Sequence, residues 1–468
     1  MLWSSGFLRA SIVRGHPALE SDVMLLPPVQ DTAFNSNSHS IYTQTGELRR
    51  AWPKWILLML LALLIAAPAS TKMAGAAWLL IGLIGLWAAL RIPVVRSVNS
   101  ALVQSSLVWL SACFLAFALQ AVATYYWADP WGDRHVEVRL LLGAAATFAL
   151  VRRLCLSPQQ KTWLTHALAL ACWVALGISY LYGRETPSNA IPWAAGVSFF
   201  VCLLPPLSMQ SPITGWRRGA WSLSVLAGVV AVLLSQSRGS YGLVLWLVLF
   251  VGIASVKQLI QRRRSMGKEW SKGAASRLFN GAVAVSMLAV VLMSFPRIYQ
   301  EPLARVQQAW SEIKELSAPS QPHAQVINTS VGARLHMWRM ALKEISEAPL
   351  LGHGSKARIA WIHHLGESSG SDGIKMLDHL HSDLLTTVFD HGLLGLLSYL
   401  SLGVALAWIA LRTKLYDTRL RWSVAGVLWM HLSSGLTNTN FGHNYYGVML
   451  ALSLALAWIL STDETNES

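Results

Sequence analysis

Charged side chains are scarce in this sequence. Asp, Glu, Lys and Arg make up 13% of the 468 residues, whereas hydrophobic residues make up 54%. A soluble domain usually carries about 25% charged residues. The deficit excludes an ordinary soluble protein and indicates that lipid, rather than water, surrounds most of the chain.

Cysteines and familiar catalytic motifs are also few. Cys113, Cys155, Cys172 and Cys202 lie in or beside apolar segments without CxxC spacing, so neither a disulfide framework nor a zinc site is indicated. The sequence contains no P-loop, GxSxG, dinucleotide-binding or HExxH motif. We therefore expect no metal and no other cofactor.

The first 50 residues are polar, and they lack the apolar core and small-residue cleavage site of a signal peptide. We expect them to form a poorly ordered cytoplasmic tail. Whether translation starts at Met1 or at Met24 is left open by the sequence.

Long apolar segments dominate the rest of the chain, and about 20 such residues span a bilayer as a helix. Twelve segments, completed by flanking Trp, Tyr, Arg and Lys, predict an all-α polytopic membrane protein with about 12 transmembrane helices. They lie at about 55–70, 74–90, 101–125, 136–154, 163–182, 191–208, 220–234, 241–256, 278–295, 392–411, 422–436 and 445–460.

The distribution of basic residues predicts the orientation of these helices. With a cytoplasmic N-terminus, 23 of the 37 Lys and Arg fall on the inner side, and the short outer loops carry few. This pattern follows the positive-inside rule. Both termini are then cytoplasmic, and the net charge of +14 reflects topology rather than binding to nucleic acid.

We accordingly divide the chain into five parts. Two cytoplasmic tails enclose two groups of transmembrane helices and one large periplasmic loop. The parts are the tail 1–50, helices 1–9 in 51–295, the loop 296–381, helices 10–12 in 382–460 and the tail 461–468.

The periplasmic loop shows two helical patterns. Apolar residues at helical spacing follow Pro302 up to Leu316, and a second stripe contains Leu335, Trp338, Leu342 and Ile345. These patterns predict a small helical cap with apolar faces on the outer membrane surface. Residues 353–380 are rich in Gly, Ser and His, and we expect a mobile cover there.

His381 lies where this polar loop meets the next hydrophobic segment. Ser382 or Asp383 would cap the helix that follows. The positive end of that helix disfavours a charged imidazole, and a neutral imidazole is what a general base needs. The alternative is an interfacial histidine that makes only hydrogen bonds.

Two arginines are predicted on the same side of the membrane. Arg238 stands in the tight external turn Ser235–Ser240, and Arg334 stands near the start of the second loop helix, four residues before Trp338. A guanidinium can bind a phosphate through two hydrogen bonds. Alternatively, Arg238 reaches lipid phosphates, and Arg334 is a surface residue without a role.

Three other features are harder to place. Asp390 and His391 would be unfavourable within the bilayer, unless Gly392 and Gly395 bend the chain so that 382–390 forms a short interfacial helix. Arg139 and Glu137 would pair with each other, and His391 has no predicted function.

The motifs Ser237-Arg238-Gly239, Arg334-x3-Trp338 with Pro349-Leu-Leu-Gly352-His-Gly354, and His381-Ser-x2-Leu385-x6-Gly392-x2-Gly395 occur in this order. In this order and on one membrane side, they resemble the O-antigen ligase and polymerase superfamily over roughly 230–410. Members of that superfamily are inner-membrane glycosyltransferases with a large periplasmic loop.

The resemblance implies an O-antigen ligase of the bacterial inner membrane. The donor would be a polysaccharide on undecaprenyl diphosphate, and the acceptor would be a sugar hydroxyl of lipid A-core. His381 would be the catalytic base, and Arg238 and Arg334 would bind the diphosphate. The expected partners are these two lipid-linked glycans and membrane lipids, without nucleic acid.

Other functions remain open at this point. An O-antigen polymerase and a protein O-oligosaccharyltransferase belong to the same superfamily, although the single large loop and the short C-terminal tail favour the ligase. A transporter is the alternative from another class. Its usual mark, two matching halves with interrupted helices, is not evident in the sequence.

Overall fold

The computed structural model describes residues 40–42, 48–94, 100–209, 215–265, 297–316, 327–412 and 418–461. Most of the predicted N-terminal tail, nearly all of the C-terminal tail and the predicted span 278–295 lie outside these residues.

The described chain is almost entirely helical, as predicted. The long helices are α1 (Lys54–Ala66), α2 (Thr71–Arg91), α3 (Ser100–Trp127), α4 (His135–Val151), α5 (Pro158–Tyr182), α6 (Ala190–Met209), α7 (Gly215–Leu234), α8 (Gly242–Ser265), α15 (Asp383–Arg412), α16 (Thr418–Gly435) and α17 (Asn444–Ser461). The 3-10 helices are η1 (Ala67–Ala69), η2 (Trp131–Arg134) and η3 (Arg238–Ser240). Three short strands, β1 (Ser40–Tyr42), β2 (Leu48–Ala51) and β3 (Leu154–Cys155), pair in the order β1-β2-β3, the first pair antiparallel and the second parallel.

Eleven of the twelve predicted segments fall on one helix each. Within the described residues, seven helices are long and apolar enough to cross a membrane, and two shorter apolar helices occur at Lys54–Ala69 and Gly219–Leu234. The chain is therefore an all-α polytopic membrane protein. Local signals explain where some helices begin: at α5, Ser157 and Gln160 form a reciprocal cap around Pro158.

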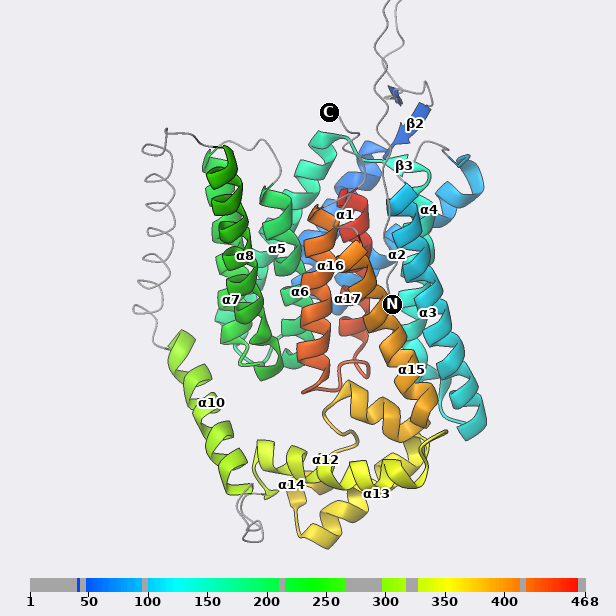
Figure 1. Ribbon diagram of the computed structural model, residues 1–468, viewed down its shortest axis with the longest axis vertical. Helices are drawn as coiled ribbons and strands as arrows, with labels where there is room; N and C mark the ends of the chain where they lie inside the picture. The colour runs from blue at the N-terminus through cyan, green and yellow to red at the C-terminus, as the bar shows by residue number, and fades with distance from the viewer. Residues whose placement is uncertain are drawn as a thin grey trace, which may run out of the picture. The chain divides into compact units, whose positions relative to one another are not determined.

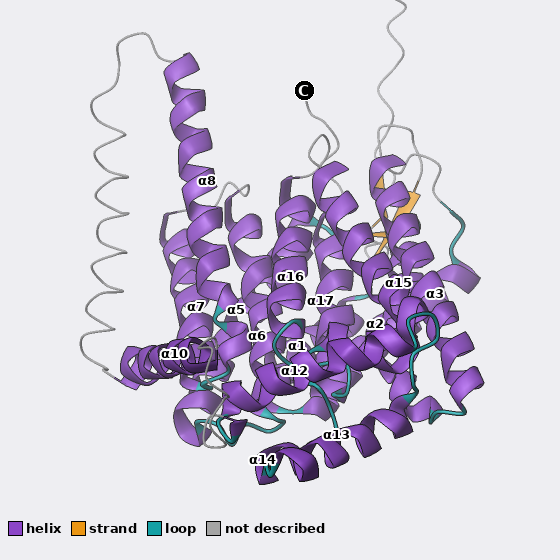
Figure 2. Cartoon of the chain, turned by 60° about the horizontal axis from the view of Figure 1, so that its bottom comes forward, coloured by secondary structure: helices purple, strands orange, loops and turns teal. Residues whose placement is uncertain are grey.

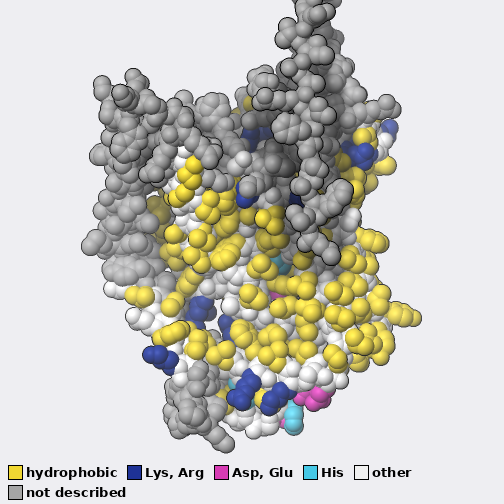
Figure 3. Space-filling view, in the orientation of Figure 1, with side chains coloured by type: hydrophobic (Ala, Val, Ile, Leu, Met, Phe, Trp, Pro, Cys, Tyr) yellow, Lys and Arg dark blue, Asp and Glu magenta, His cyan; other side chains and the backbone are white. Residues whose placement is uncertain are grey.

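The helices form a bundle with a helical cap across one end. The cap contains α12 (Ser330–Glu347), α13 (Ser355–Ser369) and α14 (Asp372–Lys375), which lie across the long helices (Figures 1 and 2). Hydrophobic side chains form a broad belt over the middle of the visible face, and charged side chains gather at the capped end (Figure 3). The cap end is thus a polar end of the bundle.

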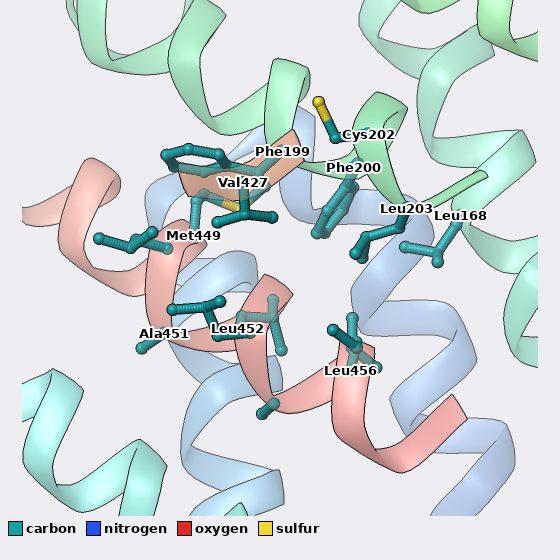
Figure 4. Packing of buried hydrophobic residues seen from close by; sticks show 14 of the residues in the cluster. Leu168, Phe199, Phe200, Cys202, Leu203, Val427, Met449, Ala451, Leu452 and Leu456 are labelled. Carbon is teal, nitrogen blue, oxygen red and sulfur yellow. The ribbon is translucent and has the colours of Figure 1, made fainter. Parts of the chain in front are cut away.

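Tight packing around α6 and α17 holds the centre of the bundle together. Phe199 and Phe200 of α6 are buried among side chains that include Leu168 of α5, Val427 of α16 and Met449 of α17 (Figure 4). Because lipid tails are as apolar as leucine, close packing and internal hydrogen bonds stabilise such helices. The indole N–H of Trp193, for example, donates to the carbonyl of Pro68 at 2.8 Å.

The predicted periplasmic loop contains several helices in its described residues. Residues 353–380, where a mobile cover is expected, contain helices α13 and α14. The helix expected near Pro302 begins at Arg297 and runs to Leu316 as α10. In α12, Ala333, Met337 and Ala341 are buried, whereas Leu342 is 57% exposed. Of the predicted stripe, Trp338 and Ile345 pack against this buried cluster, whereas Leu342 does not.

A bend at Gly392 divides α15, as the glycine-bend alternative predicted. Gly392 has φ 54° and ψ −133°, which separates a short helix before it from the span that follows. A Cβ at this position would lie 2.6 Å from the carbonyl carbon of Leu350. Only glycine combines this backbone conformation with this close approach without strain.

Candidate functional site

His381 occupies a strained position between α14 and α15. Its φ of 52° lies in the left-handed region, which costs a non-glycine residue about 1–3 kcal/mol and is often found at functional sites. Leu380 before it accepts a hydrogen bond from the Trp338 indole at 2.6 Å, and the Ser382 hydroxyl accepts one from the N–H of Leu385 at 3.4 Å. These contacts hold the histidine against α12 and α15.

The His381 imidazole is held in its neutral form. Burial lowers the pKa of His381 to about 3, with smaller contributions from the charge of Arg334 and from His379. The rings of His379 and His381 have centroids 4.4 Å apart. Burial likewise lowers the pKa of His379 to about 4, with Arg358 the next cause.

Arg334 lies beside both histidines. Burial, and secondarily the charge of Arg238, lowers the pKa of Arg334 to about 10. Its Nη1 donates to the carbonyl oxygen of Thr437 at 3.2 Å. Two guanidiniums therefore lie near each other, and one of them is beside the histidine pair, which is an arrangement suited to a ligand with several negative charges.

Arg238 reaches this place because η3 packs against the loop that joins α16 to α17. A Cβ added to Gly239 would overlap the side chain of Asn438 and lie 2.8 Å from the hydroxyl of Thr437. The glycine in Ser237-Arg238-Gly239 thus lets the backbone of the turn approach this loop. The residue before the turn, Gln236, also has a positive φ, of 57°.

The α16–α17 loop, residues 436–443, was missed as part of the site. Its Asn438 carbonyl accepts from the N–H of Asp383 at 3.1 Å, and the Asp383 carboxylate accepts from the N–H of Phe441 at 2.9 Å. The loop therefore connects both arginines to the start of α15. Its signal in the sequence is the run Thr437-Asn-Thr-Asn440, a polar stretch between two spans.

Asp390 and His391 have partners that sequence reasoning did not find. Asp390 accepts from Nε of Arg358 at 2.7 Å, and His391 Nε2 lies 3.3 Å from Oδ2 of Asp129. Ser355 also donates to Asp129, through its hydroxyl at 2.7 Å and its N–H at 3.1 Å. Burial raises the pKa of Asp129, but these hydrogen bonds outweigh it and lower that pKa to about 2.

The expected pair between Arg139 and Glu137 was wrong. Glu137 lies 3.8 Å from Nη1 of Arg134, because Arg134 immediately precedes α4 on the same turn as Glu137. Arg134 also donates to the side chain of Gln120 at 2.6 Å. These contacts join the start of α4 to α3.

The described residues form no metal site. No three or more His, Cys, Asp or Glu side chains there converge as ligands of a metal ion would. The four cysteines are free and buried.

Residues 223–400 match the model of a family described as O-antigen ligase. This region belongs to the O-antigen ligase superfamily. The matched residues include Arg238, Arg334 and His381, so all three predicted site residues lie inside the O-antigen ligase region. The α16–α17 loop lies beyond its end.

An uncharacterized protein of Haemophilus influenzae is 26% identical to this chain over 120 residues. The match covers 25% of this chain and 30% of the relative, so the two are similar over less than a third of the relative's length.

Proposed function

We propose that this O-antigen ligase homologue transfers a polysaccharide from undecaprenyl diphosphate to a sugar hydroxyl of lipid A-core at the periplasmic face of the inner membrane. The observation that supports the proposal is that Arg334 lies near both His381, whose pKa is lowered, and Arg238. These residues come from three segments separated by tens of residues, and they meet at a polar end of a membrane bundle.

The proposed chemistry is a direct displacement. His381 accepts the proton of the acceptor hydroxyl, whose oxygen attacks the anomeric carbon of the donor sugar. The bond between that carbon and the diphosphate oxygen breaks, and its electron pair leaves with undecaprenyl diphosphate. Arg238 and Arg334 stabilise the negative charge that develops on the leaving group. One displacement inverts the configuration at the anomeric carbon.

The donor is already activated by its diphosphate, so the reaction needs no nucleotide, and the guanidiniums take the place of a divalent cation. Polymerase and protein oligosaccharyltransferase activities would use the same donor chemistry with a different acceptor. The choice of lipid A-core rests on the resemblance of the region to O-antigen ligases.

Reconstitution tests this function directly. Purified protein in nanodiscs is mixed with undecaprenyl-diphosphate glycan and lipid A-core, without nucleotide and with a chelator, and the product is followed by gel mobility. We expect ligation by the wild-type protein, none with His381→Ala, and little with Arg238→Lys, because an ammonium cannot replace a two-pronged guanidinium.

A different experimental outcome would contradict each part of the proposed mechanism. Equal ligation by His381→Ala would rule out the base, and a requirement for added metal would rule out the metal-free mechanism. Transfer to a growing glycan or to a protein, but not to lipid A-core, would identify the polymerase or the oligosaccharyltransferase instead.

A further inference from the structure

A cavity of about 500 Å³ lies next to His379 of the histidine pair. Its walls come from the start of α4, the first turns of α13, the first half of α15 and residues 439–443, and they include His379. Neither Arg238 nor Arg334 lines it. Its size falls in the range of roughly 300–1,000 Å³ typical of small-molecule sites.

In the walls of this cavity, Asp and Glu outnumber Lys and Arg by five to three, and both arginines are paired with carboxylates. Glu137 faces Arg134, and Asp390 faces Arg358. A diphosphate is bound by cations that remain available to it, whereas these cations are already paired with carboxylates. A wall of alternating donors and acceptors instead suits a ligand whose hydroxyl groups both donate and accept hydrogen bonds.

Several wall residues carry polar atoms that the protein itself leaves unsatisfied. Within the described part of the chain, Glu137 Oε2, Thr386 Oγ1, His391 Nδ1 and Thr439 Oγ1 are buried without a hydrogen-bond partner. Buried polar atoms in proteins nearly always have partners. A concentration of exceptions around one cavity indicates that something polar, with several hydroxyls, completes these hydrogen bonds.

We infer that this cavity binds the saccharide part of the acceptor. The inference rests on the proposed function and adds the location of its second substrate. His379 lines the cavity, and its ring contacts that of His381. The acceptor hydroxyl therefore approaches the base from the cavity side, while the donor diphosphate lies on the arginine side.

Filling the cavity tests the inference. Ile359 lines it from α13, and the next residue, Ala360, is exposed and outside it. At saturating donor, we expect Ile359→Trp to raise the KM for lipid A-core by about tenfold or more, as an indole takes space that the sugar needs. The matched control Ala360→Trp should leave that KM unchanged, and both variants should keep the wild-type KM for the donor.

Two smaller substitutions test the cavity without the bulk that could disturb folding. Thr386→Val and Thr439→Val remove hydroxyls that no described residue uses, so folding loses no hydrogen bond. We expect both to keep the wild-type melting temperature and to raise the KM for lipid A-core. An unchanged KM for lipid A-core in all three cavity variants would overturn the inference. A changed KM for the donor would also overturn it, because that result would place the donor glycan in the cavity.

Direct binding separates this inference from the proposed function. The binding of labelled lipid A-core to nanodisc-embedded protein is measured without donor. Weaker binding to Ile359→Trp than to Ala360→Trp supports the cavity even if no ligation occurs, in which case only the transfer reaction fails. Equal binding to both overturns the cavity assignment even if ligation is robust.

Discussion

His381 is neutral mainly because it is buried, and secondarily because Arg334 lies nearby. The sequence predicted a neutral imidazole from the position of the residue before a helix, so the outcome was right while the largest cause was different. Burial depends on how the cap packs on the bundle, and periodicity alone does not reveal that packing.

The low pKa of His381 determines how the proposed reaction depends on pH. A base with a folded-state pKa of about 3 stays unprotonated as the pH falls through 6.5, where a free histidine gains its proton. We therefore expect kcat/KM for ligation to stay flat from pH 8 to about pH 5. The measurement is a pH series in which each sample is returned to pH 7.5 to check that it has not denatured. A fall in kcat/KM centred near pH 6.5 would contradict the assignment.

Single residues differ in how far the sequence revealed them. Arg238 stood out as a positive charge in a short external turn, Arg334 as a cation at a helix start, and His381 as a histidine where the loop meets a span. Asp129 was not recognised, because its partner His391 is 262 positions away and nothing local links the two. Asn438 was also missed, since it contributes through its backbone carbonyl, which every residue possesses.

At the level of elements, the bend in α15 explains why the segment Pro349-Leu-Leu-Gly352-His-Gly354 lies against the glycines after His381. In a straight helix, the N–H of Leu393 would bond to the carbonyl of Phe389. Here it donates to Pro349 at 2.9 Å, and the Phe389 and Asp390 carbonyls accept from His353 and Gly354, each at 2.9 Å. The loop before α13 thus satisfies the backbone groups that the bend releases.

Substitution at the bend should be far more harmful than substitution elsewhere in α15. We expect Gly392→Ala to destabilise the protein by at least about 1–3 kcal/mol from its positive φ alone, with further loss from the overlap with Leu350. The control is Gly403→Ala on the same helix, where an added Cβ meets nothing within 4 Å and the change should stay within about 1 kcal/mol. Melting temperatures in one detergent compare the two, and equal values would show that the bend is not constrained.

The positions of the helices were easier to predict than which face of each helix is buried. Hydropathy located the spans because each must satisfy its backbone internally within lipid. The loop helices gave weaker signals: α10 has apolar residues at helical spacing, yet Trp310 is 63% exposed. An apolar stripe shows that one face avoids water, and it does not say whether protein or lipid covers that face.

For the whole molecule, two buried polar contacts join the cap to the bundle. Arg358 of α13 reaches Asp390 of α15 and also donates from Nη1 to the carbonyl of Asp378. Ser355, at the start of α13, donates to Asp129 beyond the end of α3. The walls of the cavity and the position of His379 depend on these contacts.

Removing one partner of the Arg358–Asp390 pair should destabilise the protein mainly because the other partner is left as an unpaired buried charge. Arg358→Met leaves the Asp390 carboxylate buried and unpaired, and we expect a loss of about 3–5 kcal/mol. The double variant Arg358→Met/Asp390→Leu removes both charges and should recover much of it. Thermal unfolding of both variants in one lipid mixture provides the comparison. A double variant no more stable than the single one would mean that the pair acts by more than charge compensation.

The contact between Arg334 and Thr437 has a consequence for biosynthesis. The ribosome makes roughly 200 residues between Arg238 and Thr437, which takes on the order of 10–40 s. During that time the first guanidinium is already in the membrane, while the loop that joins it to the rest does not yet exist. The site proposed for the diphosphate is therefore incomplete in a nascent chain until the hairpin of α16 and α17 has been inserted.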